Sequence, residues 1–106
     1  MAFKNLNDIE KKEIYPGYKA KFIHTENITL AHWTIEEDSF FPEHMHPHEQ
    51  VLSMLEGKFE LTVGLETKIL KPGDVAIIPP NIPHTGKALK KTKAIDIFYP
   101  HREDYV

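Results

Sequence analysis

The chain has 106 residues, of which 41% are apolar, and a formal net charge of −3, a length that suits one domain with its own core. The absence of cysteine excludes a disulfide scaffold, a thiolate zinc finger, an iron–sulfur site and a thiol nucleophile. Interspersed charges argue against a nucleic-acid partner, and no apolar run approaches the ~20 residues of a membrane helix. The N-terminus is too charged for a secretory signal, so we expect a soluble, cytoplasmic protein.

The predicted elements are short. Near the N-terminus, residues 5–13 lack Pro and Gly, and the segment NDIEKKE, residues 7–13, could form one helical turn with Asn7 or Asp8 as its cap. The remainder is typical of short strands, predicted at Lys19–His24, Ile28–Ile35, Gln50–Leu55, Lys58–Val63, Thr67–Leu70, Val75–Ile78 and Lys93–Tyr99. Turn signals every ~8–12 residues favour an all-β antiparallel sandwich or barrel, in a single domain over residues 1–106.

Histidines are the unusual feature of the composition, because three of the seven, His44, His46 and His48, lie close together. His44, His46 and Gln50 share parity, so an extended chain would place their side chains on one face. Two imidazoles at that spacing can bind one metal ion, and His84 is the candidate for a further ligand from across a barrel. On spacing alone, a solvated loop or an adventitious metal patch is the alternative. We expect His48 to be a neighbour of the site rather than a ligand.

Two segments resemble the two cupin motifs. The residues that match the first motif are His44, His46, Gln50 and Gly57, with Gln in place of the usual acid. The residues that match the second motif are Gly73, Pro79, Pro80, Asn81 and His84. The usual final Asn of that motif is missing, because Ala88 stands at its position. This resemblance implies the antiparallel double-stranded β-helix of the cupins, a jelly-roll barrel, with one divalent metal ion.

The stretch from residue 15 to 106 looks like the pectin-degradation cupins of the KdgF type. The closing segment DIFYPHRED, residues 96–104, discriminates between families because generic cupins lack it. The resemblance implies that the protein linearises 4,5-unsaturated monouronates released from pectin and alginate. It assigns the metal to His44, His46, Gln50 and His84, and the active site to Asp96, Phe98 and Arg102. It also implies a homodimer, since small cupins often pair through N-terminal strands.

The chemistry of that reaction suits these residue types. A divalent metal stabilises a developing oxyanion, and nitrogen and oxygen ligands leave Zn, Ni, Fe, Mn and Co open. The neutral Gln50 leaves the full charge of the ion on the site, which favours an anionic ligand. Asp96 lies on an apolar strand, where burial would raise its pKa and suit it to proton transfer. Arg102 suits bidentate recognition of a carboxylate, and Phe98 could pack on the sugar face.

Other interpretations stay open at this point. The same metal set could serve another cupin enzyme, a dioxygenase or an isomerase, or a non-catalytic module that binds or senses sugars. Asp96 could be satisfied by a buried partner, and Arg102 could be a surface residue of a polar tail. We expect Trp33 and Met54 to belong to the core or rim rather than to contact a ligand specifically.

Overall fold

The structure is a computed structural model that describes residues 2–106. The strands are β1 Lys12–Tyr15, β2 Tyr18–His24, β3 Thr29–Ile35, β4 Phe40–His44, β5 Glu49–Glu56, β6 Phe59–Val63, β7 Glu66–Leu70, β8 Val75–Ile78, β9 His84–Ala88 and β10 Thr92–Tyr99. Two short 3₁₀ turns, η1 Leu6–Asp8 and η2 Glu103–Tyr105, complete the elements of this part of the chain. The predicted all-β fold is therefore confirmed.

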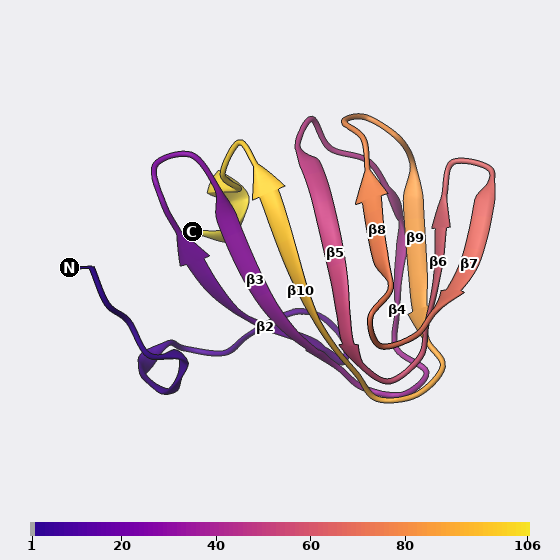
Figure 1. Cartoon of the computed structure of the whole chain (residues 1–106), viewed down its shortest axis with the longest axis horizontal. Coiled ribbons are helices and arrows are strands. Elements are labelled where there is room, and N and C mark those ends of the chain that lie inside the picture. Colours follow the sequence, from indigo (N-terminus) through magenta and orange to yellow (C-terminus); the bar gives the residue numbers. More distant parts are fainter. Residues whose placement is uncertain (1) are drawn as a thin grey trace.

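The strands form two antiparallel sheets that face each other as a barrel (Figure 1). The larger sheet has the order β1-β2-β3-β10-β5-β8, and the smaller has the order β4-β9-β6-β7. Every pair of neighbouring strands is antiparallel, as expected for a jelly roll. Among residues 2–106, no helix has the length and apolar character needed to cross a membrane.

The chain ends differ from the sequence prediction in detail. The N-terminal turn covers Leu6–Asp8, and its cap is Asn5, whose side chain accepts a hydrogen bond from the Asn7 backbone N–H. Asn7 and Asp8 were the predicted caps, and both lie inside the turn. The following residues form β1, which pairs with β2 at the edge of the larger sheet. A second 3₁₀ turn, η2, follows β10, where no helical element was predicted.

Strands β4 and β9 were not predicted, although both carry candidate metal ligands. β4 contains Pro42, which weakens its strand signal, and β9 reads HTGKA, with no large apolar residue. The inward face of β9 carries His84, Gly86 and Ala88, all of them buried. A Cβ at Gly86 would lie 2.3 Å from the Phe59 ring. The inward face of β9 therefore carries small residues at Gly86 and Ala88 because the Phe59 ring occupies the space next to Gly86.

The core lies between the two sheets and is rich in aromatic residues. Its buried aromatic members are Tyr18, Phe22, Trp33, Phe41, Phe59 and Phe98. The buried polar residues are Thr29, His46, Gln50, His84, Thr92, Asp96 and Arg102. Because buried polar groups need partners or a function, the core is polar at the positions that carry most of the predicted site.

Candidate metal centre and pocket

The candidate ligands come from both sheets rather than from one strand. His44 ends β4, His46 lies in the β4–β5 connection, Gln50 lies on β5, and His84 begins β9. The prediction of one shared face for His44, His46 and Gln50 is wrong, because β4 belongs to the smaller sheet and β5 to the larger. His44 and His84 are direct cross-strand partners. The connections involved lie at one end of the barrel, the upper end in Figure 1.

Three imidazoles converge at this end. One ring nitrogen from each of His44, His46 and His84 lies within 4.8 Å of the others. The ring centroids of His44 and His46 lie 4.5 Å and 4.9 Å from that of His84. Three histidine nitrogens at this separation could hold one metal ion.

Each of these rings is oriented by a backbone carbonyl. His44 Nδ1 donates to Pro42 O at 3.1 Å, and His84 Nδ1 donates to Ile82 O at 3.0 Å. His46 Nδ1 donates to His48 O at 3.1 Å. A proton held on Nδ1 leaves the lone pair on Nε2, which is the arrangement that metal-binding histidines show.

The Gln50 amide continues this ligand set. Its Oε1 lies 3.0 Å from His46 Nε2. With the His46 proton on Nδ1, two lone pairs face each other there, an arrangement that a cation relieves by binding both atoms. Turning the amide would instead place an N–H against the ring. The donor set thus fits a divalent ion bound by three imidazoles, with the Gln50 oxygen next to them.

The surroundings favour the neutral form of two of the rings, those of His46 and His84. Burial, and after it the charge of Arg102, lower the pKa of His46 to about 4. Burial also lowers the pKa of His84, against the hydrogen bond to Ile82. Since a metal ion binds the unprotonated imidazole, these shifts keep the ring nitrogens available at neutral pH.

Asp96 lies on β10 with its carboxylate inside the barrel. Its Oδ2 accepts a hydrogen bond from Trp33 Nε1 at 2.9 Å, while its Oδ1 is buried without a partner. Burial raises the pKa of Asp96 to about 7, although Gln50, Trp33 and Arg102 each lower it. A carboxyl group with this pKa can both accept and donate a proton near neutral pH.

Arg102 follows β10 and turns its side chain into the barrel. Its Nε and Nη2 donate to the two Asp104 carboxylate oxygens at 2.9 Å and 2.7 Å. The bidentate edge that the sequence analysis offered to a substrate carboxylate is therefore taken by Asp104. Nη1 is buried without a partner, so the free donor of this side chain is Nη1.

Aromatic residues make most of the remaining wall. Phe98 packs beside the His46 ring at 5.8 Å between centroids. Tyr15, Tyr18 and Tyr105 also line the pocket, and sequence reasoning missed all three because aromatic residues on strands usually signal core packing. Trp33, expected only in the core or rim, is the hydrogen-bond donor to Asp96.

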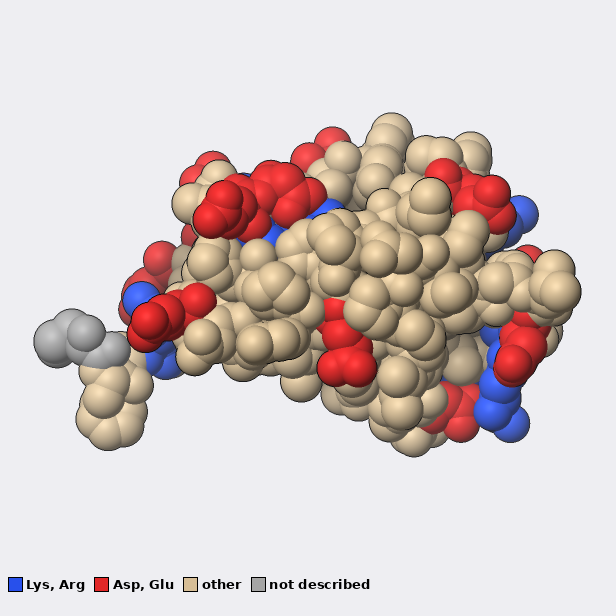
Figure 2. Space-filling view, turned by 90° about the horizontal axis from the view of Figure 1, so that it is seen from above, with Lys and Arg blue, Asp and Glu red and all other residues tan. Residues whose placement is uncertain are grey.

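These groups meet in one pocket. Its wall includes His44, Gln50, His84, Asp96 and Arg102. Figure 2 views the upper end of Figure 1 and shows a mostly uncharged surface in the middle, with acidic and some basic side chains toward the margins. Among the described residues that line the pocket, Arg102 is the only Lys or Arg.

A jelly-roll barrel with clustered histidines at one end defines the cupin class of metal-binding proteins. The family described as Cupin_2, cupin domain, matches residues 31–98. The chain therefore belongs to the cupin domain family. A comparison with curated proteins gave no match.

Solved structures with the same fold include two that align over nearly their whole length. An RmlC-like cupin from Shewanella frigidimarina has a TM-score of 0.94 and 27% identity, and the match covers 100% of this chain and 96% of that one. KdgF from a Halomonas species has a TM-score of 0.92 and 26% identity, with coverages of 100% and 99%. Oxalate decarboxylase from Bacillus subtilis, at 18% identity and a TM-score of 0.80, covers 90% of this chain and 28% of its own and shows the fold alone.

Proposed function

We propose that this cupin is an enzyme that converts cyclic 4,5-unsaturated monouronates to linear 5-keto-4-deoxyuronates by ring opening and tautomerisation. The observation that carries the proposal is the meeting, in one pocket, of His44 and His84 from the histidine cluster, the buried Asp96 carboxyl and Arg102 with its unpartnered Nη1. The full-length similarity to KdgF supports the same activity.

The reaction is an isomerisation that needs no redox partner. The bond between C1 and the ring oxygen breaks, the C1 hydroxyl loses its proton, and C1 becomes an aldehyde. The ring oxygen becomes an enol oxygen on C5. A proton is then added at C4, the enol proton leaves, and C5 becomes a ketone. The site must therefore bind a carboxylate, stabilise charge on oxygen and move protons.

Asp96 is the proposed proton carrier. A pKa of about 7 allows the carboxylate to take the C1 hydroxyl proton and the resulting acid to deliver a proton to C4. Trp33 fixes Oδ2, which leaves Oδ1 as the oxygen that faces the reaction. Because the pocket is mostly aromatic, water competes little for these protons.

Arg102 is the proposed anchor for the substrate carboxylate, through Nη1. Phe98 would pack against the sugar face. The proposed metal ligands are His44, His46, His84 and Gln50, and a bound divalent ion, one of Zn, Ni, Fe, Mn or Co, would supply Lewis acidity toward substrate oxygen. The neutral Gln50 would leave the charge of that ion uncompensated.

The test is the absorbance of the conjugated double bond of 4,5-unsaturated galacturonate, followed with and without the metal-loaded protein. We expect the protein to accelerate the loss of absorbance over the spontaneous rate, and the matched variant Asp96→Asn to lose most of that acceleration. An unchanged rate with wild-type protein would contradict the proposal. Oxygen consumption would instead favour a dioxygenase, and sugar binding without turnover would favour a binding module.

We also propose that the protein acts as a single-domain homodimer. On the outer face of the larger sheet, Ile97 of β10 lies opposite Val51 of β5, which lies opposite Ile77 of β8. Ile97 and Ile77 are 40% and 66% exposed, and such an apolar row suits burial against a second copy. Sedimentation equilibrium should give twice the chain mass, and Ile77→Lys should lower it toward the monomer.

A further inference from the structure

The guanidinium of Arg102 is held on several sides at once. Its Cζ lies 4.8 Å from the centre of the Phe98 ring and 4.2 Å from that of Tyr105. Nε and Nη2 donate to both oxygens of Asp104. The side chain of Arg102 is only 7% exposed, whereas that of Asp104 is 58% exposed. The Asp104 carboxylate thus contacts the guanidinium from the solvent side, and Nη1 lies on the buried side.

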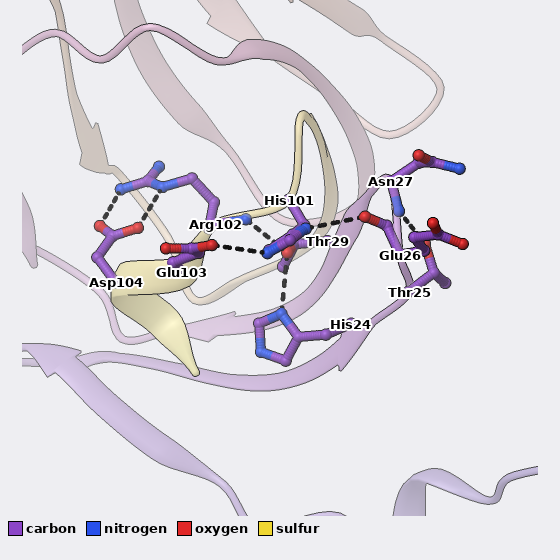
Figure 3. A network of polar contacts seen from close by, with 9 residues as sticks. All are labelled: His24, Thr25, Glu26, Asn27, Thr29, His101, Arg102, Glu103 and Asp104. Carbon is purple, nitrogen blue, oxygen red and sulfur yellow. Dashed lines mark hydrogen bonds and ion pairs between the residues drawn. The ribbon is translucent and has the colours of Figure 1, made fainter.

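The backbone of this segment is anchored as well (Figure 3). The Arg102 N–H donates to the hydroxyl of the fully buried Thr29 at 2.8 Å, and the same hydroxyl lies 2.9 Å from His24 Nδ1. His101 Nδ1 donates to the carbonyl of Glu26 at 3.0 Å. Both contacts join the segment after β10 to the β2–β3 hairpin. The origin of the Arg102 side chain is therefore fixed independently of Asp104.

We propose that Asp104 is the positioning residue that makes Arg102 selective for a single carboxylate; this inference rests on the proposed function of the pocket. With the Arg102 backbone fixed, Asp104 sets the rotation of the guanidinium by occupying Nε and Nη2, and Nη1 stays without a protein partner on a side chain that lines the pocket. It also balances the Arg102 charge. The pair therefore offers directed N–H donors with little net charge.

The selectivity follows from that balance. A monoanionic carboxylate gains charge-assisted hydrogen bonds from Nη1 without needing more than one positive charge. At the Arg102 end of the pocket, a dianionic phosphate ester needs more compensation than a neutral Arg–Asp pair supplies, and the Asp104 carboxylate repels it more strongly than it repels a monoanion. We therefore infer that the pocket binds sugar acids more tightly than sugar phosphates. Removal of Asp104 should reduce this difference in affinity.

The test compares Asp104→Ala with the conservative Asp104→Glu and with Glu103→Gln. Glu103 is the neighbouring acid, 87% exposed, and it pairs with His101 rather than with Arg102. Calorimetric titration of each metal-loaded protein uses D-galacturonate, which has no double bond to react, and D-galactose 6-phosphate. Metal content and thermal unfolding are measured alongside, and Asp104→Asn, which keeps the side-chain volume, is a second variant in case the alanine protein does not fold.

For Asp104→Ala we expect galacturonate affinity to fall about tenfold, the size of one charge-assisted hydrogen bond, while phosphate affinity rises or stays constant. Asp104→Glu should recover most of the loss, and Glu103→Gln should match the wild type. With the unsaturated substrate, KM should rise about tenfold while kcat changes less than about threefold, because the affected contact is made in the ground state.

The results that would contradict the Asp104 positioning role differ from those that would contradict the proposed enzymatic function. Turnover by the wild type with an unchanged galacturonate affinity in Asp104→Ala overturns the positioning role and leaves the proposed function standing. Galacturonate binding that depends on Asp104, without turnover, supports the positioning role and contradicts the proposed enzyme. A wild-type protein that does not bind galacturonate, or that binds the phosphate ester equally well, overturns the inference.

Discussion

The two sides of the pocket are organised in different ways. On the histidine side, each ring is fixed by a backbone carbonyl two residues away in the chain. On the opposite side, Asp96 depends on Trp33, 63 positions away, and the Arg102 N–H depends on Thr29, 73 positions away. Ring orientation on the first side is therefore a local property, whereas the second side exists only when the larger sheet is assembled.

His84→Ala should have the largest effect on metal affinity and activity. The change should affect the histidine side of the pocket and leave the contacts of Asp96 and Arg102 intact. Removing one of three imidazoles should lower metal affinity by more than the ~10–100-fold that loss of an outer partner causes, and activity should fall with it. Elemental analysis after dialysis measures this loss. His32→Ala, on the partly exposed face of β3, is the matched control. Full metal content in His84→Ala would contradict the assigned site.

Asp96→Asn should show that the two sides of the pocket act separately, because it should reduce catalysis without affecting metal binding at the histidines. We expect kcat to fall by about 10²- to 10⁴-fold, the usual contribution of proton transfer, with metal content unchanged. Trp33 can still donate to the amide oxygen, so the fold should persist. Steady-state kinetics and metal analysis on the same sample measure both effects, and wild-type kcat would remove the catalytic role of Asp96.

Trp33→Phe should lower the free energy of unfolding by acting on the Asp96 side of the pocket, which depends on contacts between distant segments. It removes the N–H that satisfies Asp96 Oδ2, and an unsatisfied buried acceptor costs about 1–3 kcal/mol in the free energy of unfolding. Urea denaturation measures the change. Combining the variant with Asp96→Asn should give less than the sum of the two single effects, and strict additivity would show that the hydrogen bond does not couple them.

The smallest expected effect is a pH dependence of the stability that the partly exposed Arg102–Asp104 pair contributes. The hydrogen bonds from Arg102 lower the pKa of Asp104 below its ordinary 3.8. The resulting stabilisation is complete above that pH and is lost as pH falls through the lowered value. The stability difference between wild type and Asp104→Asn should therefore shrink below about pH 4, by less than about 1 kcal/mol because the pair is partly exposed. Chemical denaturation as a function of pH tests this, and a difference that grows in acid would contradict it.

The same contrast separates what the sequence could predict from what it could not. Residue spacing along the chain was enough to select the histidines that the structure brings together, although the reason given, shared strand parity, was wrong. The alternation of β10 correctly placed Asp96 on the same face as Ala94 and Phe98, and all three side chains are buried. These patterns were readable because each depends on a few neighbouring positions.

Contacts between distant segments were not readable. Nothing around Trp33 indicates that its indole N–H donates to a carboxylate on another strand, and nothing near Tyr105 indicates that its ring covers Arg102. The engagement of Arg102 by Asp104 was open to sequence reasoning, since the two are close in the chain. The polar tail suggested solvent exposure instead, whereas Arg102 is held inside by packing against Phe98 and Tyr105 and by the backbone hydrogen bond to Thr29.

The position of the candidate ligands on both sheets has a mechanical consequence. His44 and His84 belong to the smaller sheet and Gln50 to the larger, and no ladder of backbone hydrogen bonds joins the two sheets within residues 2–106. An ion bound by this set would act as a cross-link between the two walls of the barrel. Opening motions of the barrel and loss of the ion would then be one coupled event, so hydrogen exchange at β4 and β9 should slow as metal occupancy rises.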